Sequence, residues 1–400
     1  MNKSDISDLV LFGGQPLFDE IKSTSNLVQP DPAKFFKYAR KSFDARWITN
    51  NGPIVQELEA RLASVHGVSH CVSVCNGLWG LVLSMSCIAL EGRREVIMPS
   101  LTYRRLADIV AWLGLVPRFC EVSPVNLGVT RETVEACIND QTAIILAPHP
   151  IVSLCDIDGL EALSEAAGIP LLFDSVEAAH ATHGGKQVGG FGVAECFSMH
   201  ASKFLNGFEG GYITTNNSML AKKLKIKRAF GFAGEDNVEE LGLNAKLNEL
   251  HAAMTLASVD DIPAQLVRNK LLYDAYESGL SGMSIRLVQY QQNEVRTHKN
   301  ILVELTEDWP YTREKTLELL HSENMLARPY YYPPLHEKET SYQTISENLS
   351  LSSNLSLHYM LLPSGDFLDV EDVDAICRFL KFLESNSSEV SRRDVKPSEK

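Results

Sequence analysis

Long apolar runs and basic tracts are both missing from this 400-residue chain. No stretch reaches the roughly 18 uninterrupted apolar residues of a membrane span. The first residues, Met1 to Asp5, lack the apolar core of a secretion signal. The formal net charge is -14, and an acidic chain without a basic tract is a poor match for nucleic acid or for an anionic membrane. We therefore expect neither as a partner.

Paired cysteines are absent as well. The eight cysteines are scattered, with no CxxC pair and no His-rich spacing beside them. Such spacings are what indicate a disulfide framework or a zinc site, whereas cysteines within apolar runs are typical of small core residues. The sequence thus predicts a cytoplasmic protein without a metal site.

Helical and strand-like patterns alternate between about residues 54 and 215. Short apolar strands are expected at 70–74, 95–98, 117–122, 142–146 and 169–174, with helical segments between most of them. This pattern is typical of a parallel sheet with helices on both faces. Ligands of such sheets bind beyond the carboxyl ends of the strands. Asn76, Asp174 and the segment after Met98 all follow strand ends, so we expect them to converge.

The pattern changes toward the end of the chain. A long helical region is expected at 247–279, then short strands at 285–288 and 301–305, and helices near 314–323 and 370–383. We predict a large α/β domain with an N-terminal arm at residues 1–260 and a smaller α+β domain at 261–384. Residues 385–400 are polar and charged, and we predict a disordered tail there.

One lysine has unusual surroundings. Lys203 lies between small or aromatic residues and a Gly-rich turn, 29 residues after Asp174, which ends an apolar run. Desolvation lowers the pKa of an amine, and a neutral amine attacks carbonyls. Enzymes that use pyridoxal 5'-phosphate hold the cofactor on such a lysine and pair an acidic residue with its pyridinium nitrogen. On these two residues alone, a buried structural aspartate and an ordinary lysine remain an equal alternative.

Further motifs, in order along about residues 8–383, resemble the pyridoxal-phosphate-dependent sugar aminotransferases often called the DegT/DnrJ/StrS family. The matching stretches are Ile48–Pro53, Asn76–Gly77, Pro99–Tyr103, His149 with Asp156–Asp158, Asp174–Glu177, Phe197–Lys203, Glu209–Gly211, Asn244–Glu249 and Tyr332–His336. The resemblance implies an aminotransferase of fold type I. Such a protein has a mostly parallel central sheet with flanking helices and a smaller C-terminal α+β domain, and it uses pyridoxal 5'-phosphate.

The resemblance also implies roles around the cofactor ring. Lys203 would be the catalytic residue, binding the cofactor as a Schiff base and then moving protons. Asp174 would keep the pyridine nitrogen protonated, and Tyr103 would stack on the ring. Glu177 would lie near the ring and its phenolic oxygen, at a position where the family often has Gln.

A second implied group of residues would bind the cofactor phosphate. It consists of Ser198 together with the backbone around Gly77 and Leu78. Asn244 would reach the phosphate of the neighbouring subunit, which implies a homodimer with shared sites. The arginine that the family has near this asparagine is Lys246 here, which keeps the charge and loses bidentate geometry.

The reaction expected from the resemblance is a ping-pong transamination with L-glutamate as the amino donor. Residues 8–14 and 206–211 look most like the branch that contains the desosamine-pathway 4-aminotransferase, which aminates a TDP-4-keto-6-deoxy sugar. Some relatives carry histidine in place of the lysine and dehydrate instead, and the presence of Lys203 argues against that chemistry.

The chain departs from the family pattern near the expected pocket. Leu78 and Trp79 stand where a threonine and a small residue are usual, and Arg104 and Arg105 follow the stacking aromatic. These changes indicate neutral drift, an acceptor pocket remodelled for a carboxylate or phosphate, or degraded cofactor binding. Arg104 is therefore a candidate for binding the substrate.

Two further residues, His298 and Arg328, are candidates for the substrate side, and each could equally be a structural hydrogen-bonding residue. Two rival functions stay open on the sequence. One is transamination of a non-nucleotide or carboxylated ketone of secondary metabolism. The other is a non-catalytic protein that keeps the fold for regulation or partner binding.

Overall fold

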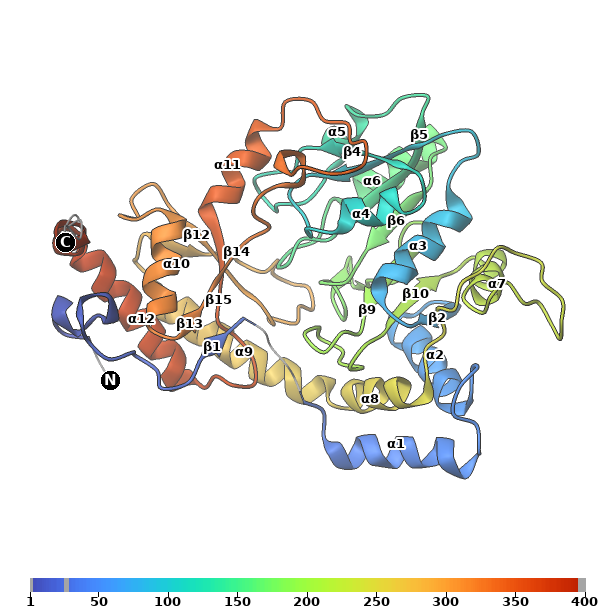
Figure 1. Ribbon diagram of the computed structural model, residues 1–400, viewed down its shortest axis with the longest axis horizontal. Helices are drawn as coiled ribbons and strands as arrows, with labels where there is room; N and C mark the ends of the chain where they lie inside the picture. The colour runs from blue at the N-terminus through green and yellow to red at the C-terminus, as the bar shows by residue number, and fades with distance from the viewer. Residues whose placement is uncertain (1–2, 25–28, 395–400) are drawn as a thin grey trace.

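The computed structural model describes residues 3–24 and 29–394 (Figure 1). Its larger part is built on a seven-stranded sheet with the strand order β2-β10-β9-β6-β5-β3-β4. The strands are β2 (His70–Val74), β3 (Glu95–Pro99), β4 (Val116–Cys120), β5 (Thr142–Pro148), β6 (Leu171–Asp174), β9 (Ala194–Ser198) and β10 (Gly211–Thr215). Only β10 runs antiparallel to its neighbours in this sheet, so the predicted mostly parallel sheet is confirmed.

Helices cover both faces of this sheet. One face packs on α3 (Gly77–Ile88), α4 (Leu106–Ala111) and α7 (Ser218–Lys227), and the other on α2 (Pro53–His66), α6 (Ile157–Ala167) and α8 (Glu249–Asp260). The central strand β5 is buried along its whole length, and its apolar side chains alternate between the two cores, Leu146 in one and Ile145 and Ala147 in the other. Burial on both faces explains why this strand is continuously apolar.

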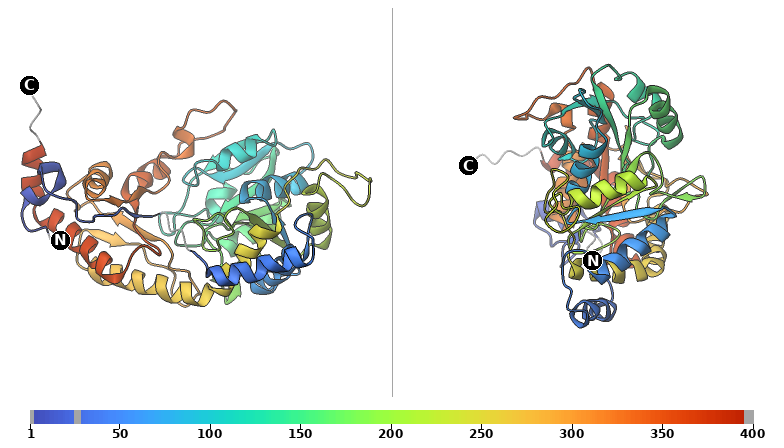
Figure 2. Two further views of the ribbon diagram at one scale, coloured as in Figure 1. Left: turned by 60° about the horizontal axis from the view of Figure 1, so that its bottom comes forward. Right: turned by 90° about the vertical axis from the view of Figure 1, so that its right-hand side faces the viewer.

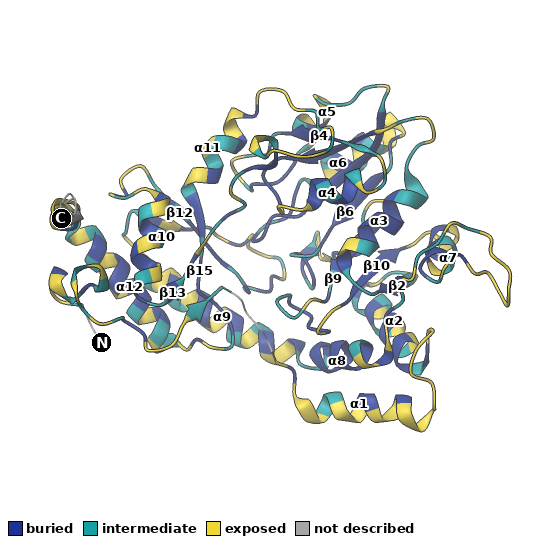
Figure 3. Ribbon diagram, viewed as in Figure 1, coloured by how far each residue is buried: buried dark blue, intermediate teal, exposed yellow. Residues whose placement is uncertain are grey.

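Two further helices belong to the larger part of the molecule. Helix α1 (Pro32–Asp44) packs along α8 with its outer face exposed, and α5 (Arg131–Glu135) packs against α6 (Figure 3). The predicted long helix at 247–279 is two helices. Asp261 separates α8 from α9 (Ile262–Gly279), and Pro263 starts the second helix because its first turn needs no N–H from that residue.

The smaller part holds a four-stranded antiparallel sheet, in the order β11-β12-β15-β14. Its strands are β11 (Ile285–Leu287), β12 (Ile301–Leu305), β14 (Arg328–Pro329) and β15 (Tyr359–Leu362), and its helices are α10 (Arg313–Ser322), α11 (Ser350–His358) and α12 (Val370–Ser385). Helix α9 runs from the end of α8 into this domain and packs against α12 (Figures 1 and 2).

Residues 3–23 pack on the smaller domain, although the prediction placed the whole N-terminal arm with the larger one. Strand β1 (Lys22–Ser23) pairs with β13 (Met325–Leu326). The buried carboxylate of Glu323 accepts hydrogen bonds from the backbone of Val10 at 3.1 Å and of Leu17 at 2.8 Å. Local sequence patterns do not indicate this packing, because Glu323 is some 300 residues away from Val10 and Leu17.

The predicted disordered tail was wrong for residues 387–394. They form α13 (Ser387–Asp394), and Val390 is 1% exposed within the core of the small domain. Val390 is a single apolar residue in a polar segment, so the sequence shows no helical periodicity there and its polar composition wrongly indicates disorder. Residues 395–400 lie outside the described residues. No helix within 3–24 and 29–394 has the length and apolar character to cross a membrane.

Candidate active site

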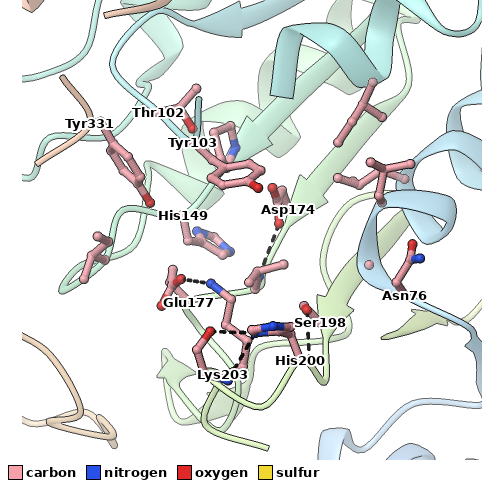
Figure 4. A pocket seen from close by; sticks show the side chains of 18 residues that line it. Asn76, Thr102, Tyr103, His149, Asp174, Glu177, Ser198, His200, Lys203 and Tyr331 are labelled. Atoms are coloured by element: carbon pink, nitrogen blue, oxygen red, sulfur yellow. Dashed lines mark hydrogen bonds and ion pairs between the residues drawn. The ribbon is translucent and has the colours of Figure 1, made fainter. Parts of the chain in front are cut away.

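Side chains from the carboxyl ends of five strands meet around one cavity of about 430 Å³ (Figure 4). Asn76 follows β2, Tyr103 follows β3, His149 follows β5, Asp174 ends β6 and Ser198 ends β9. These five strands run in the same direction, so their carboxyl ends lie at one edge of the sheet. The predicted convergence of strand ends is therefore what the structure shows.

The first turn of α3 forms one end of the cavity. The Asn76 side chain caps the helix by accepting a hydrogen bond from the Trp79 N–H at 3.0 Å. The N–H groups of Gly77 and Leu78 have no intrahelical acceptor and point out of the helix terminus, where they can bind an anion. Gly77 also lies close to the end of β9, because a Cβ placed on it would be 3.1 Å from the Ser198 Cβ.

Asp174 and His149 form the floor of the cavity. Asp174 is 8% exposed, and burial raises the pKa of its carboxyl to about 6, although the Val176 N–H donates to it. The imidazole of His149 stacks on Phe173, with ring centroids 5.1 Å apart. Its Nδ1 faces Cys155, while its buried Nε2 has no hydrogen-bond partner. Burial also lowers the pKa of His149 to about 3, so the ring is neutral.

Lys203 and Glu177 form a half-buried ion pair that also lines the cavity (Figure 4). Burial favours the neutral amine of Lys203, but the Glu177 carboxylate outweighs it and raises the pKa of the lysine. The same pairing, together with Lys299, lowers the pKa of Glu177 to about 2 against the opposing effect of burial. The amide of Asn300 donates to the other Glu177 oxygen at 3.4 Å. At rest the site therefore holds a protonated lysine on an ionised glutamate.

Seven of the predicted cofactor residues line this cavity. They are Gly77, Leu78, Tyr103, Asp174, Glu177, Ser198 and Lys203. Tyr103 is 53% exposed, so its ring is free to cover a ligand. Of the two departures beside Gly77, only Leu78 lines the cavity, because the Trp79 ring packs against Trp112 with centroids 6.4 Å apart.

The three residues suggested for the substrate side lie outside this cavity. Arg104 is exposed, as is Arg328 on β14. His298 packs between the rings of Tyr273 and Tyr290, with centroids 4.9 and 4.7 Å from its own. Within one chain, none of the three therefore contacts the space next to Lys203.

Asn244 also lies away from the cavity. It is exposed, and its side-chain oxygen accepts a hydrogen bond from the Lys246 Nζ at 2.6 Å. Lys246 lines a separate surface cavity of about 520 Å³, together with Asn50, Asn51, Val55, Lys225, Arg228, Ala229, Phe230, Phe232 and Leu247. A role for Asn244 at the cofactor thus requires a second chain.

Sequence reasoning assigned no role to several residues of the site. His149 and Thr102 line the cavity from the ends of β5 and β3, and their positions after apolar strands could have marked them. Tyr331 lines it from the small domain, and Lys299 and Asn300 lie next to Glu177. No local pattern signals these three, since their place depends on how the two domains pack.

The residues fit pyridoxal 5'-phosphate. The cofactor needs an acid for its pyridine nitrogen, donors for its phosphate and an amine for its aldehyde. Asp174, the start of α3 with Ser198, and Lys203 provide these groups around a single cavity. The unpartnered Nε2 of His149 is a buried polar atom that such a ligand would satisfy. No cluster of three or more His, Cys, Asp or Glu side chains suited to a metal occurs among the described residues.

Known proteins with related sequences are aminotransferases. The chain is 27% identical to GDP-perosamine synthase of Vibrio cholerae over 349 residues, which cover 86% of this chain and 95% of that protein. It is 32% identical to the L-glutamine:2-deoxy-scyllo-inosose aminotransferase of Streptomyces lividus over 262 residues, 61% of each chain.

A solved structure matches almost the whole fold. The structure of DesI in the presence of its TDP-sugar product superposes with a TM-score of 0.92 and 29% identity, over 98% of this chain and 100% of that one. The sequence pattern of the DegT/DnrJ/EryC1/StrS aminotransferase family matches residues 31–381. Members of this family use pyridoxal phosphate, which is the cofactor the motifs indicated. The chain therefore belongs to the DegT/DnrJ/EryC1/StrS family of pyridoxal-phosphate-dependent aminotransferases.

Proposed function

We propose that this enzyme transfers an amino group from L-glutamate to a keto sugar, and that the acceptor is a nucleotide-linked 4-keto-6-deoxy sugar. The observation that carries the proposal is the single cavity that joins Lys203, Asp174 and Ser198. The choice of acceptor is supported by two similar proteins, DesI with its TDP-sugar product and GDP-perosamine synthase, both of which are named for nucleotide sugars.

Lys203 is the residue proposed to do the chemistry. Pyridoxal phosphate, when bound, supplies an electron sink for the reacting carbon. Lys203 Nζ must give up its proton before it can attack a carbonyl, and afterwards the same atom is placed to carry a proton between neighbouring carbons. Asp174 Oδ atoms would hold a proton on the pyridine nitrogen. Burial destabilises the ionised form of the Asp174 carboxyl, and a protonated pyridine nitrogen beside it would stabilise that form.

The proposed phosphate site combines backbone and hydroxyl donors. The N–H groups of Gly77 and Leu78 and the Ser198 hydroxyl would contact the phosphate oxygens. Leu78 contributes no side-chain donor, and the missing hydrogen bond to a charged acceptor is worth about 1 kcal/mol or more. The chain itself places Asn244 elsewhere, so we propose a homodimer in which Asn244 of each subunit completes the phosphate site of the other.

A ping-pong order of substrates is part of the proposal, and the presence of Lys203 in one cavity supports it. One cavity of about 430 Å³ must accept the cofactor and then each substrate in turn. Lys203 is in reach of only one substrate at a time, so we propose that glutamate leaves as 2-oxoglutarate before the keto sugar enters.

The test combines a spectrum with a chemical trap. The purified protein loaded with pyridoxal phosphate is reduced with borohydride, and peptides are mapped by mass spectrometry. We expect a pyridoxyl group on Lys203, while the other lysines serve as internal controls. Adding L-glutamate without acceptor should bleach the cofactor band and release one 2-oxoglutarate per site. A pyridoxyl group on a different lysine, or no 2-oxoglutarate before acceptor is added, would contradict the proposal.

A second candidate acceptor is a cyclic ketone without a nucleotide. The Streptomyces lividus relative, at 32% identity, is named for 2-deoxy-scyllo-inosose, and the exposed Arg104 beside the cavity lacks the partner that Arg105 has in Asp108 at 3.0 Å. Assays of the loaded enzyme with TDP-linked keto sugars, inososes and keto acids distinguish the candidates. Turnover of the inosose alone would make the second candidate the function.

A further inference from the structure

The small domain reaches the cavity through Tyr331. Among the described residues that line the cavity, Tyr331 alone comes from this domain, where it follows β14. In the view of Figure 4 its ring enters from the side opposite Asn76, and its hydroxyl is directed toward the interior. One phenol of the small domain therefore faces the groups that gather at the strand ends of the large one.

The backbone of Tyr331 is in the left-handed region, with a φ of 43°. Residues with a Cβ rarely adopt this conformation, and for a bulky side chain it is an outlier. Such strain persists only where the surrounding contacts fix the chain, and strained residues are concentrated at binding and active sites. The conformation of Tyr331 therefore points to a function for the side chain that it places.

The residues on either side of Tyr331 are held firmly. Tyr330 is 1% exposed in the core of the small domain, and its N–H donates to the carbonyl of Tyr359 at 3.1 Å. The ring of Tyr332 lies against the guanidinium of Arg313, whose central carbon is 4.1 Å from the ring centroid. The Tyr331 ring packs on that of Tyr330, with centroids 4.4 Å apart. These contacts keep the strained residue in place and orient its phenol.

The hydroxyl of Tyr331 forms no hydrogen bond with any residue of 3–24 and 29–394. Burial raises the pKa of the phenol, so it stays neutral and can both donate and accept a hydrogen bond. Once a ligand excludes water from the cavity, a polar group without a partner would cost free energy. The ligand itself is therefore expected to provide that partner.

The lining of the cavity favours a hydroxylated ligand. No arginine is among the described lining residues, and the lysine of the cavity pairs with Glu177. A carboxylate is bound most strongly by a cation, above all by arginine, whereas a sugar hydroxyl suits a neutral group that donates and accepts. Thr102 adds a second hydroxyl to the lining. The phenol of Tyr331 therefore matches a keto sugar better than it matches an amino acid.

We propose that Tyr331 binds a hydroxyl of the keto sugar and thereby selects a hydroxylated acceptor, while it contributes nothing to the reaction of L-glutamate. The inference rests on the proposed function, in which the two substrates use this cavity in turn. Glutamate carries carboxylates and an amine but no hydroxyl, so only the acceptor would contact the phenol. Tyr331 is thus a specificity-determining residue supplied by the small domain.

The experiment separates the two halves of the reaction in the enzyme loaded with pyridoxal phosphate. Tyr331→Phe keeps the ring and removes only the hydroxyl. The rate at which L-glutamate releases 2-oxoglutarate without acceptor should be unchanged, whereas kcat/KM for TDP-4-keto-6-deoxyglucose should fall by about fivefold or more. Calorimetry with protein loaded with pyridoxamine phosphate should show that this sugar binds more weakly by a similar factor.

The matched control is Tyr330→Phe, which removes the hydroxyl of the neighbouring ring. Tyr330 is not among the residues that line the cavity, so both halves of the reaction should keep their wild-type rates. An unchanged kcat/KM for the sugar in Tyr331→Phe, or an equal loss in the glutamate and sugar reactions, would overturn the inference.

A second pair of variants tests the strained backbone. Tyr331→Gly and Tyr331→Ala both remove the ring, but only glycine adopts a positive φ without strain. We expect urea unfolding to show the glycine variant as the more stable of the two, although both lose activity with the sugar. If the alanine variant is the more stable, the backbone of residue 331 is not strained and does not hold the ring in place.

The proposed function can fail separately from this inference. The borohydride map and the release of 2-oxoglutarate test Lys203 and the amino donor without involving Tyr331. If the loaded enzyme turns over the inosose instead of the TDP sugar, the same comparison of Tyr331→Phe with wild type is made with the inosose, which is also a hydroxylated ketone. Success of the map with unchanged acceptor kinetics in Tyr331→Phe would reject this inference alone.

Discussion

The hydroxyl of Ser100 and Nδ1 of His336 lie 2.6 Å apart. The backbone N–H of His336 also donates to the Ser100 hydroxyl at 3.1 Å, and that of Leu335 to the Ser100 carbonyl at 2.9 Å. Ser100 is fully buried and comes just before Thr102 and Tyr103. The loop that provides the aromatic wall of the cavity is thus held by a segment of the small domain.

Ser100→Ala tests this link. The change leaves the buried Nδ1 of His336 without its partner, so we expect the free energy of unfolding to fall by about 1–2 kcal/mol. We also expect weaker binding of pyridoxal phosphate, because Tyr103 loses its support. Urea unfolding and titration of the cofactor absorbance measure the two effects. Ser164→Ala removes a similar hydroxyl, 2.6 Å from the Ile169 carbonyl, and should affect stability only. Equal cofactor affinity in Ser100→Ala and wild type would show that the link does not support the site.

Glu177→Gln should move the acid limb of the pH profile of kcat/KM to lower pH. Burial alone lowers the pKa of Lys203, and Glu177 is what raises it. Without the carboxylate the effect of burial prevails, so the neutral amine forms at lower pH and the acid limb of kcat/KM moves down. The exposed Glu209, whose carboxylate lies 3.8 Å from Nε2 of His200, offers the control Glu209→Gln. An acid limb that stays in place or moves up would refute the assigned role of Glu177.

The larger domain could be predicted because its signals are local. Strand β5 is continuously apolar since both its faces are buried, and Asn76 and Gly77 mark the turn into α3 by their cap and close packing. The N-terminal arm was assigned to the wrong domain because its anchor, Glu323, is distant in sequence. Helix α13 was missed because one apolar residue, Val390, holds it.

The site shows the same division between local and distant signals. Lys203, Asp174 and Ser198 follow strands of one parallel sheet, so their meeting could be expected from the order of strands alone. Other residues near these three side chains come from the small domain. Lys299, Asn300 and Tyr331 belong to the small domain, and which of its side chains reach the cavity depends on how the domains pack. His298, predicted as a candidate for the substrate side, packs between two tyrosines outside the cavity.

The stability contributed by Glu195 should fall as the pH rises from mildly acidic to neutral. Burial raises the pKa of Glu195 from its ordinary 4.5 to about 7, even though Ser175 and the N–H groups of Gly189 and Phe191 donate to it. An acid whose pKa is higher in the folded chain binds its proton more tightly there, so the stability it contributes is lost between these two pKa values. For Glu195 the loss is on the order of 2 kcal/mol between about pH 5 and pH 8.

Glu195→Gln should remove most of this dependence. The amide oxygen still accepts from Gly189 and Phe191, at 2.6 and 2.9 Å in the native chain, and it carries no charge to bury. The contributions of Asp174, whose pKa burial raises to about 6, and of His149, whose pKa burial lowers to about 3, have opposite signs and are common to both proteins. Thermal unfolding at several pH values makes the comparison. We expect the variant to be more stable than wild type near pH 8 and similar near pH 5, and a parallel pair of curves would contradict the assignment.

If the two subunits share their active sites, two impaired variants should recover activity when they form a hybrid dimer. If Asn244 serves the site of the partner subunit, Lys203→Ala and Asn244→Ala damage residues of one site that come from different chains. A hybrid dimer of the two variants then has one site with both changes and one site with neither. Each variant alone should be inactive or strongly impaired, whereas a mixture that exchanges subunits should recover activity.

The size of the recovery is set by counting. In an equal mixture about half of the dimers are hybrids, and each has one intact site out of two, so about a quarter of the wild-type activity is expected. Mixing Lys203→Ala with Asp174→Ala is the matched control, because both residues line one cavity of the same chain. If each site takes both residues from one chain, every site of the hybrid dimer carries a defect. That hybrid has two sites with one defect each and should recover nothing. Light scattering first shows that the mixture contains dimers. If the Asn244 mixture still recovers no activity, Asn244 does not serve the site of the partner subunit.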